Sequence, residues 1–419
     1  MNNSTRGGHE NEDWGGIPVI VLFGDDYQLT PPCDEGAIDS FTSSGNSNIT
    51  KNGAYQFIKL GECTGKLNII VRQDKEQQEF RNILANTRIG SPTDENVAAL
   101  MSLHLNSNEF SIQDAQNIEK KAMYVFANKK KMKTFNTERL KEQHSKPNPI
   151  ARLKVQSTSK NVKSTKIPKC FKNDNDIQPI ISLCREAKVQ ICGKNFEPDW
   201  GLFNGAVVTV KEIVFNKDEN PLDGTLPQYI IVDFPDYCGP PWMENKPTWV
   251  PIPQIELSCS NFCCLIRFIP LSLAYAKTGH TFQGQPAGPD NAIKCIIIQP
   301  GSCSVEKLCP GLLYMFISRG STIGEKGNRI RSSIFFIGDE LTKERIKNLT
   351  KIKSGELCPK IKHRTRWINY LKKNKLHADI SEHNKNDLIK WAAKTTVSKR
   401  TVKRIIQDDT WRMCENINY

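Results

Sequence analysis

The sequence has few of the features that identify membrane, secreted or metal-binding proteins. No run of about 18 apolar residues occurs in the chain, so the sequence predicts no membrane-spanning helix. Residues 1–16 have no charged-then-apolar order and do not resemble a signal peptide. The 14 cysteines include no C-x-x-C pair, and none of the seven histidines lies at metal-ligand spacing from another. We therefore expect reduced thiols, as is usual in nuclear and cytosolic proteins, and no metal cluster.

Acidic residues are scarce at the C-terminal end. The whole chain carries 58 Lys and Arg against 45 Asp and Glu, a net charge of +13. Residues 341–419 hold 20 of the basic and 8 of the acidic residues, so this tail accounts for +12 of the charge. A basic tail on a nearly neutral body indicates attraction to a polyanion, most often a nucleic acid. A solvated, disordered tail is the alternative.

Apolar runs separated by helical patterns predict an α/β fold of two or three domains. Residues 17–23, 122–128 and 292–300 are continuous apolar runs, typical of strands buried on both faces of a parallel sheet, and 331–339 closes the ordered body.

Helical spacing predicts three helices. One is capped by Asp74 and ends before Gly90, a second begins at Thr93 or Asp94, and a third covers residues 310–320. Residues 129–176 are rich in Lys, Ser and Asn, so we expect an exposed basic insertion there.

Residues 180–270 have a different hydrophobic pattern. Five strand-like stretches occur there without a helical pattern between them: "AKVQIC", "AVVTVKEIVF", "QYIIVDF", "WVPIPQIEL" and "CCLIRFIPL". Short strands separated by turn-rich pieces predict a small antiparallel barrel inserted between α/β segments.

The stretch "VIVLFGDDYQLTPP" at 19–32 ends a buried strand with acidic and amide groups, and three interpretations compete. Asp25 and Asp26 would bind magnesium, but two-metal catalysis needs a further carboxylate from an earlier strand, and only 24 residues precede Asp25. Asp25 would instead serve a P-loop, but "GECTGKL" at 61–67 lacks the required spacing and hydroxyl. In the third interpretation Gln28 senses a nucleotide γ-phosphate, because an amide both donates and accepts without changing charge.

Six groups of residues follow one another along the chain: Gly24, Asp25, Gln28, Pro31 and Pro32; Arg72 and Gln73; Asn128 and Asn136; Gly201, Asn204 and Gly205; Thr278, His280, Gln283 and Gly284; and Ser318 and Arg319. In type and order these groups resemble six motifs of the Pif/RecD-like 5′-to-3′ DNA helicases of superfamily one, which include the helicase parts of Helitron-type transposons. The resemblance runs from about residue 15 to 338 and favours the third interpretation.

The resemblance implies RecA-like helicase lobes, the first only partial, with an inserted SH3-like β-barrel and a basic C-terminal tail. The expected boundaries are 1–120 for the remainder of the first lobe, 121–199 for the start of the second with a basic insertion, 200–270 for the barrel, 271–340 for the rest of the second lobe, and 341–419 for the tail.

The resemblance also implies ATP and Mg as cofactors and single-stranded and forked DNA as partners. It gives catalytic roles to Gln28, Arg72 and Arg319, and nucleotide contacts to these three together with Gly24, Asp25, Gln283 and Gly284. Thr278, His280 and Asn204 would face DNA, and Arg319 would be the arginine finger.

Two departures from the family pattern matter. Thr281 and Phe282 follow His280, where the family has Lys-Ser. The family's Walker A loop and Asp-Glu strand would precede the first matching motif, and the sequence contains neither. We therefore expect the chain alone to be deficient in ATP hydrolysis. The alternative to a helicase motor is a non-catalytic DNA-binding remnant of a transposon-type helicase.

The tail contains a possible helix-turn-helix at 387–408, with Lys399, Arg400, Lys403 and Arg404 on its second helix. A lone basic amphipathic helix is the alternative. We expect a nuclear protein, or a mitochondrial one if a presequence precedes this sequence. The pathway served and the oligomeric state stay open.

Overall fold

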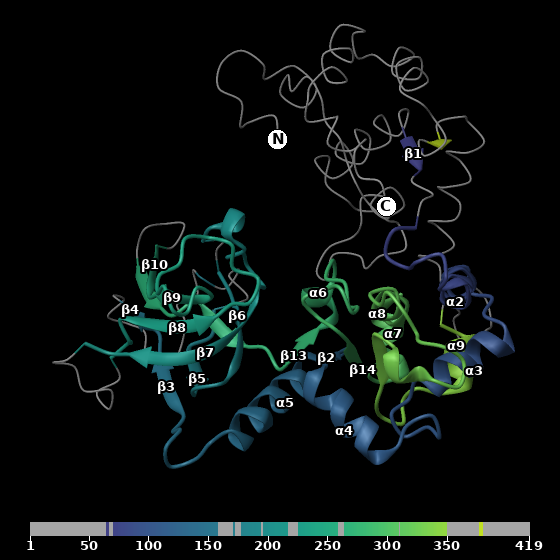
Figure 1. The fold of residues 1–419 in the computed structure, drawn as a ribbon, viewed down its shortest axis with the longest axis horizontal. Helices are drawn as coiled ribbons and strands as arrows, with labels where there is room; N and C mark the ends of the chain where they lie inside the picture. Colours follow the sequence, from purple (N-terminus) through teal and green to yellow (C-terminus); the bar gives the residue numbers. More distant parts are fainter. Residues whose placement is uncertain are drawn as a thin grey trace, which may run out of the picture. The chain divides into compact units, whose positions relative to one another are not determined.

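The structure is a computed structural model of the chain. It describes residues 64–66, 70–157, 171, 177–193, 196–216, 225–258, 264–309, 311–349 and 377–379 (Figure 1). The chain divides into two compact units. Unit 1 contains residues 1–92, 306–314 and 347–419, and unit 2 contains residues 93–305 and 315–346. The predicted strand at 17–23 and the predicted helix-turn-helix at 387–408 lie outside the described residues.

A parallel sheet forms the centre of unit 2. Its four strands run in the order β13 (Ala276–Thr278), β2 (Met123–Phe126), β14 (Ile296–Gln299) and β15 (Ile334–Phe336), and every neighbouring pair is parallel (Figure 1). All residues of β2, β14 and β15 are buried, as continuous apolar runs require. The predicted α/β fold with a parallel sheet is therefore confirmed, with strands inside 122–128 and 292–300.

Two helices precede β2 in unit 2. α3 (Asp94–Ser102) begins at Thr93, whose hydroxyl accepts from the Asn96 N–H while Thr93 N–H donates to the Asn96 side chain. α4 (Ile112–Lys121) has the same kind of capping box, from Ser111 to Asp114. Ile118 of α4 packs with Tyr124 and Phe126 of β2 in one buried cluster. The sequence analysis predicted α3 and missed α4.

α2 (Gln78–Arg88) belongs to unit 1. It buries the apolar face that helical spacing selects: Phe80, Ile83, Leu84 and Thr87. Its N-cap is Gln77 rather than the predicted Asp74, whose backbone carbonyl instead accepts from Gln77 N–H in the preceding turn. Unit 1 also contains the parallel pair β1 (Thr64–Lys66) and β16 (His377–Asp379).

α5 (Lys129–Glu142) corrects the sequence analysis, which expected residues 129–176 to be an exposed insertion. The helix begins at Asn128, whose side chain accepts from the backbone N–H groups of Lys130 and Lys131. Asn136 and Leu140 are its only buried residues, Met132 and Phe135 are partly buried, and its five lysines are exposed. Such a narrow buried stripe, half of it polar, gives almost no hydrophobic periodicity.

The insertion between α5 and β13 is mostly antiparallel. Its largest sheet runs in the order β12 (Leu271–Leu273), β6 (Lys188–Ile191), β7 (Val207–Val214), β8 (Tyr229–Asp233) and β9 (Trp249–Pro253). Smaller sheets pair β3 (Ala151–Lys154) with β5 (Ile180–Leu183), and β10 (Ile255–Ser258) with β11 (Leu265–Phe268) and β4 (Gln156–Ser157). Strands at all five predicted stretches are therefore confirmed.

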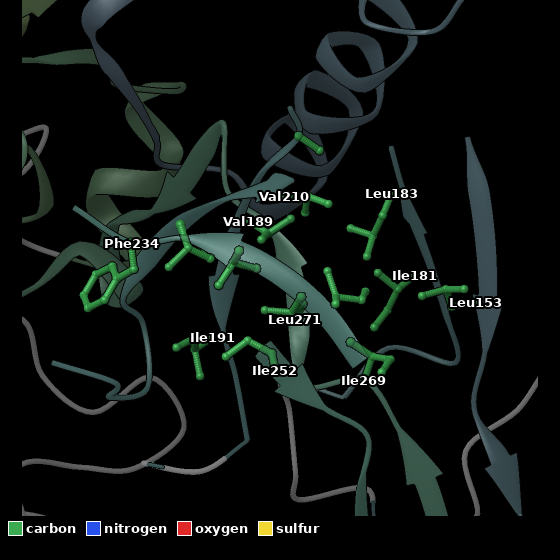
Figure 2. Packing of buried hydrophobic residues seen from close by; sticks show 14 of the residues in the cluster. Leu153, Ile181, Leu183, Val189, Ile191, Val210, Phe234, Ile252, Ile269 and Leu271 are labelled. Carbon is green, nitrogen blue, oxygen red and sulfur yellow. The ribbon is translucent and has the colours of Figure 1, made fainter. Parts of the chain in front are cut away.

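Two of those stretches each contain two strands, because the chain changes sheet within them. β9 ends at Pro253 and β10 begins at Ile255, while Pro270 separates β11 from β12. Proline lacks the N–H that would continue a ladder, so each proline suits such a change. Figure 2 shows the buried side chains of this region gathered in one cluster, with Val189 and Leu271 near its centre and Leu153 of β3 at its margin.

The remaining elements are short. They are the helices α6 (Gly279–Phe282), α7 (Cys303–Leu308), α8 (Leu312–Ile317) and α9 (Lys343–Lys347), and the 3-10 turns Pro198–Trp200 and Arg329–Arg331. α8 ends at Ile317, three residues before the predicted Gly320, because Arg319 and Gly320 N–H groups bond to carbonyls three residues back. Among the described residues, no helix combines the length and the apolar character needed to cross a bilayer.

The cap of α5 gives a test of the helix that sequence analysis missed. Asn128→Ala removes the acceptor for two backbone N–H groups, so we expect the free energy of unfolding to fall by about 1 kcal/mol in urea titrations. The matched control is Asn117→Ala at an exposed position inside α4, which should be neutral or slightly stabilising. Equal effects of the two substitutions would contradict the assignment of Asn128 as the cap.

Candidate functional site

The candidate site starts where β13 ends. Thr278 closes this strand, and α6 begins at Gly279. In parallel α/β sheets, ligands bind outside the carboxyl ends of the strands. The stretch "AKTGHTFQGQ" therefore lies at an edge of the sheet that suits binding, and its motif residues occupy the turn at that edge.

Asn136 of α5 fixes the backbone of β13. Its side-chain N–H₂ donates to the Ala276 carbonyl at 3.0 Å and the Leu273 carbonyl at 3.3 Å. Its carbonyl oxygen accepts from Ala276 N–H at 2.7 Å. Asn136 is buried, so these bonds form out of contact with water. The sequence analysis selected Asn136 as a motif residue, and the structure gives it this supporting position.

Hydroxyl groups close the turn after β13. Thr278 N–H donates to the Thr281 hydroxyl at 3.1 Å, and that hydroxyl also bonds to the Thr278 carbonyl at 3.0 Å. The two hydroxyl oxygens lie 3.1 Å apart. Thr281 stands where the resembling motif has a lysine, and here it stabilises the start of α6 instead of presenting a charge. His280 is exposed, and partial burial of its ring lowers its pKa below the ordinary value.

Lys277 is a residue to which sequence analysis gave no role. Only 2% of it is exposed. Its ammonium group donates to the Gly205 carbonyl at 2.8 Å and to the Gln285 side-chain oxygen at 3.1 Å. Burial lowers the pKa of Lys277 to about 8. The available signal was a lone cation inside the apolar run "LSLAYAKTG".

Gly205 lies in the connection between β6 and β7, directly after Asn204. Its φ of +93° is one that residues with a side chain rarely adopt, so glycine suits the carbonyl orientation that Lys277 uses. Gly205 N–H donates to the Ile191 carbonyl at 2.9 Å, which ties the turn to β6. Asn204 is exposed. The predicted DNA-facing residues Asn204 and Thr278 therefore lie beside two segments that Lys277 joins.

The chain after α6 connects this turn to the segment of Arg319. Gln283 ends α6 and Gly284 follows with a φ of +89°. Ala287 N–H then donates to the Arg319 carbonyl, and Ser321 N–H donates to the Ala287 carbonyl, each at 2.9 Å. The fifth and sixth motif-like segments are thus hydrogen-bonded to one another.

Arg319 itself is buried, with 4% exposed. Its Nε donates to the Met315 carbonyl at 3.3 Å and its Nη2 to the Ser318 hydroxyl at 3.1 Å. The guanidinium group therefore lies against the last turn of α8.

Arg72 belongs to unit 1, where it is half-buried. Burial lowers its pKa, and Tyr314 opposes that shift. The neighbouring Gln73 carbonyl accepts from Arg81 Nε at 3.0 Å, which fixes this segment to α2. The other site residues from the sequence analysis, Gly24, Asp25, Gln28, Lys399, Arg400, Lys403 and Arg404, lie outside the described residues.

The structure therefore brings together three of the motif segments and their support. Lys277 links the Asn204–Gly205 turn to Gln285, and Ala287, two residues further on, bonds to Arg319, all within unit 2. Asn136 holds the backbone of β13. Across the part of the chain that the structure describes, no group of three or more His, Cys, Asp or Glu side chains is placed to hold a metal ion.

Comparison with known proteins finds similarity at the level of solved structures. No protein-family model matches the chain. No curated protein matches it either. The chain is similar to the Pif1 helicase from Candida albicans, with 16% identity, a TM-score of 0.49, and coverage of 72% of this chain and 60% of that one. It is also similar to the Bacteroides Pif1 helicase in complex with ADP-AlF3 and ssDNA, with 19% identity, a TM-score of 0.44, and coverage of 74% and 56%.

A third similar structure is Bacteroides Pif1 bound to ssDNA, with 19% identity, a TM-score of 0.42, and coverage of 66% of this chain and 52% of that one. The chain thus spans between half and three fifths of the length of these helicases. Similarity at this level assigns no role to a single residue. The solved helicases belong to the family that the sequence motifs resemble.

The buried ammonium group of Lys277 predicts how stability changes with pH. Between the folded pKa of about 8 and the ordinary value of 10.5, the unfolded chain binds a proton that the folded chain does not. The free energy of unfolding should therefore rise with pH in this window, by about 1.4 kcal/mol per pH unit. The measurement is urea unfolding at pH 7.5 to 10, taken as the difference between the wild type and Lys277→Met. A difference that stays constant across the window would show that Lys277 is not desolvated.

Proposed function

We propose that this chain is the C-terminal motor portion of a Pif/RecD-like DNA helicase, which translocates on single-stranded DNA and unwinds duplex. The parallel sheet of unit 2 corresponds in this proposal to the second RecA-like lobe, and the antiparallel insertion to an SH3-like barrel. Residues 1–120 form the remainder of the first lobe in this proposal. ATP is the nucleotide, and single-stranded and forked DNA are the partners.

One observation carries the proposal. The segments around Asn204, Thr278 and Arg319 resemble successive motifs of one helicase family, and they are far apart in the sequence. They are nevertheless connected in space: Lys277 bonds to Gly205 and Gln285, and Ala287, two residues after Gln285, bonds to the Arg319 carbonyl. Segments with unrelated uses would have no reason to gather around the chain that leaves the carboxyl end of β13, where ligands bind in such sheets.

The proposed roles follow from the chemistry of each side chain. Arg72 and Arg319 neutralise negative charge that develops on the transferred γ-phosphoryl group. Gln28 positions the attacking water or a γ-phosphate oxygen, and the chain at Gln283 and Gly284 contacts the nucleotide. Thr278, His280 and Asn204 face the DNA strand. Cycles of lobe closure and opening then move the strand by one step for each ATP consumed.

The described residues fit a triphosphate only in part. Guanidinium and amide donors at Arg72, Arg319 and Gln283 suit phosphate oxygens. The sequence holds no G-x-x-x-x-G-K-[ST] stretch to cradle the β-phosphate, and we assign no magnesium ligand among the described residues. We therefore infer that the 419-residue polypeptide alone hydrolyses ATP poorly.

A non-catalytic DNA-binding remnant of a transposon-type helicase is the second candidate, favoured by that missing phosphate cradle. The genomic sequence upstream of Met1 separates the two. An in-frame G-x-x-x-x-G-K-[ST] and an Asp-Glu strand within about 150 residues, the length of one domain, support the motor. Stop codons in that interval support the remnant.

The proposed hydrolysis deficiency is tested by a phosphate-release assay on the purified chain. With ATP, magnesium and oligo-dT present, we expect release no faster than in protein-free buffer, because the main phosphate-binding loop is missing. Arg319→Ala should give the same background rate. Turnover by the wild type that Arg319→Ala abolishes would overturn the deficiency and support Arg319 as the finger.

The tail is tested through the salt dependence of DNA binding. We expect replacement of Lys399, Arg400, Lys403 and Arg404 by Gln to lower the slope of log Kd against log salt by about 2 to 3, since each phosphate contact on single strands contributes about 0.7. The control replaces four exposed lysines of unit 2, Lys120, Lys121, Lys141 and Lys146, with the same change in charge. An unchanged slope in the tail variant would remove these four residues from the DNA interface.

A further inference from the structure

We propose that Lys277 is a positioning residue for DNA binding, which sets the distance between the Asn204–Gly205 turn and the α6 turn by bonding to both. The inference rests on the proposed function and deepens it, because it names a residue outside the DNA surface on which the shape of that surface depends. The ligand of that surface is single-stranded DNA.

Stability alone gives no reason for a lysine at this position. The side chain is almost completely buried, with Ala276 beside it also buried, and burial of the ammonium group is unfavourable. Its partners are a backbone carbonyl and an amide oxygen, and in the described part of the chain no carboxylate pairs with it. An apolar side chain of similar length would fill the same space in β13 without that cost.

The lysine joins two loops that belong to different parts of the fold. Gly205 belongs to the antiparallel insertion, and Gln285 follows α6 at the edge of the parallel sheet. A Cβ atom built on Gly205 would lie 3.6 Å from Nε2 of Gln285, which is ordinary contact distance. The two loops therefore touch, and the charged donor of Lys277 reaches an acceptor on each of them. Bonds from a charged donor are roughly twice as strong as those between neutral groups.

The residues proposed to face DNA are direct neighbours of these anchor points. Asn204 precedes Gly205, and Thr278 follows Lys277. Asn204 and His280 are exposed, whereas Lys277 has no route to solvent. Lys277 therefore acts on DNA only through the loops that it holds. Loops already held at the right separation lose less entropy when a strand binds, and so bind it more tightly.

The test measures folding and DNA binding on the same variants of the full chain. Lys277→Met should be at least as stable as the wild type in urea at pH 7, because a buried charge is removed and both freed acceptors are only half-buried. Its Kd for fluorescein-labelled dT20 should nevertheless rise about 10-fold. Lys120→Met, at an exposed site of α4, controls for the loss of one positive charge.

Two further variants make the outcome decisive. Gln285→Leu removes one acceptor of Lys277, so it should weaken binding in the same direction, and the double variant with Lys277→Met should be no weaker than the poorer single variant. Hydrogen exchange should accelerate in residues 196–206 of Lys277→Met and stay unchanged in β14, as expected for a released turn. If Lys277→Met fails to fold, Gln285→Leu alone decides the question by the same readouts.

The controls separate failure of this inference from failure of the proposed function. Thr278→Val combined with His280→Ala should weaken dT20 binding whether or not Lys277 matters. Weak binding by that variant with wild-type binding by Lys277→Met and Gln285→Leu overturns the positioning role and leaves the proposed function in place. Binding that none of the variants alters, or no binding by the wild type, overturns both.

Discussion

The side chain of Asn136 is the constraint on which the arrangement around the candidate site depends. β13 has only three residues and lies at the edge of the parallel sheet, so among the described strands β2 alone pairs with it. Asn136 adds a donor and an acceptor to the Ala276 backbone, and in this way ties the strand to α5 as well. Because the strand follows the antiparallel insertion and leads into α6, this clamp fixes the point where the chain passes from the insertion into the parallel sheet.

The two residues that follow Ala276 have different roles. Lys277 turns into the protein and holds Gly205 and Gln285, while Thr278 caps α6 together with Thr281. Side chains alternate between faces along a strand, so one buried and one accessible residue are expected in sequence. The polar groups of Asn136 and Lys277 lie in the interior, and both have hydrogen-bond partners that justify their burial. The free-energy cost of burying the Lys277 ammonium group is therefore associated with the positions of the two loops that it joins, and not with better packing of the core.

Sequence patterns predicted the parts of the fold in which burial and hydrophobicity coincide. β2 and β14 were predictable because every one of their residues is buried. α5 was not, because Asn136 is one of its two buried residues, and α4 was not, because only Ile118 is buried. The splitting of two predicted strands at Gln254 and Pro270 depends on which sheet each half joins, and long-range pairing leaves no local signal.

The same reasoning explains what was and was not predictable about the site. The order of motifs drew attention to Asn204, Thr278, His280 and Arg319, and their segments do meet, while their roles stay predictions. Lys277 was missed because motif comparison looks for residues that touch ligands, and this lysine touches only other loops. Gln28 and the basic residues of the tail lie outside the described residues, so their roles also stay predictions.

The charges around the α6 turn indicate how DNA binding would be divided within the chain. Thr278 and Thr281 are neutral, Lys277 is buried, and partial burial lowers the pKa of His280, which favours the neutral ring. Of the lysines that open α5, Lys131 is paired with Glu340 at 2.9 Å. The turn therefore offers short-range donors, and in the proposed function long-range attraction comes from cations elsewhere, above all from the tail, which carries +12 of the net charge of +13. In the proposed function, neutral donors would position individual phosphates, whereas release of counterions from the DNA by Lys and Arg would supply the sequence-independent attraction. A motor that releases and regains phosphates at every step would be served by that separation, because the contacts it breaks at the turn would not include a full ion pair.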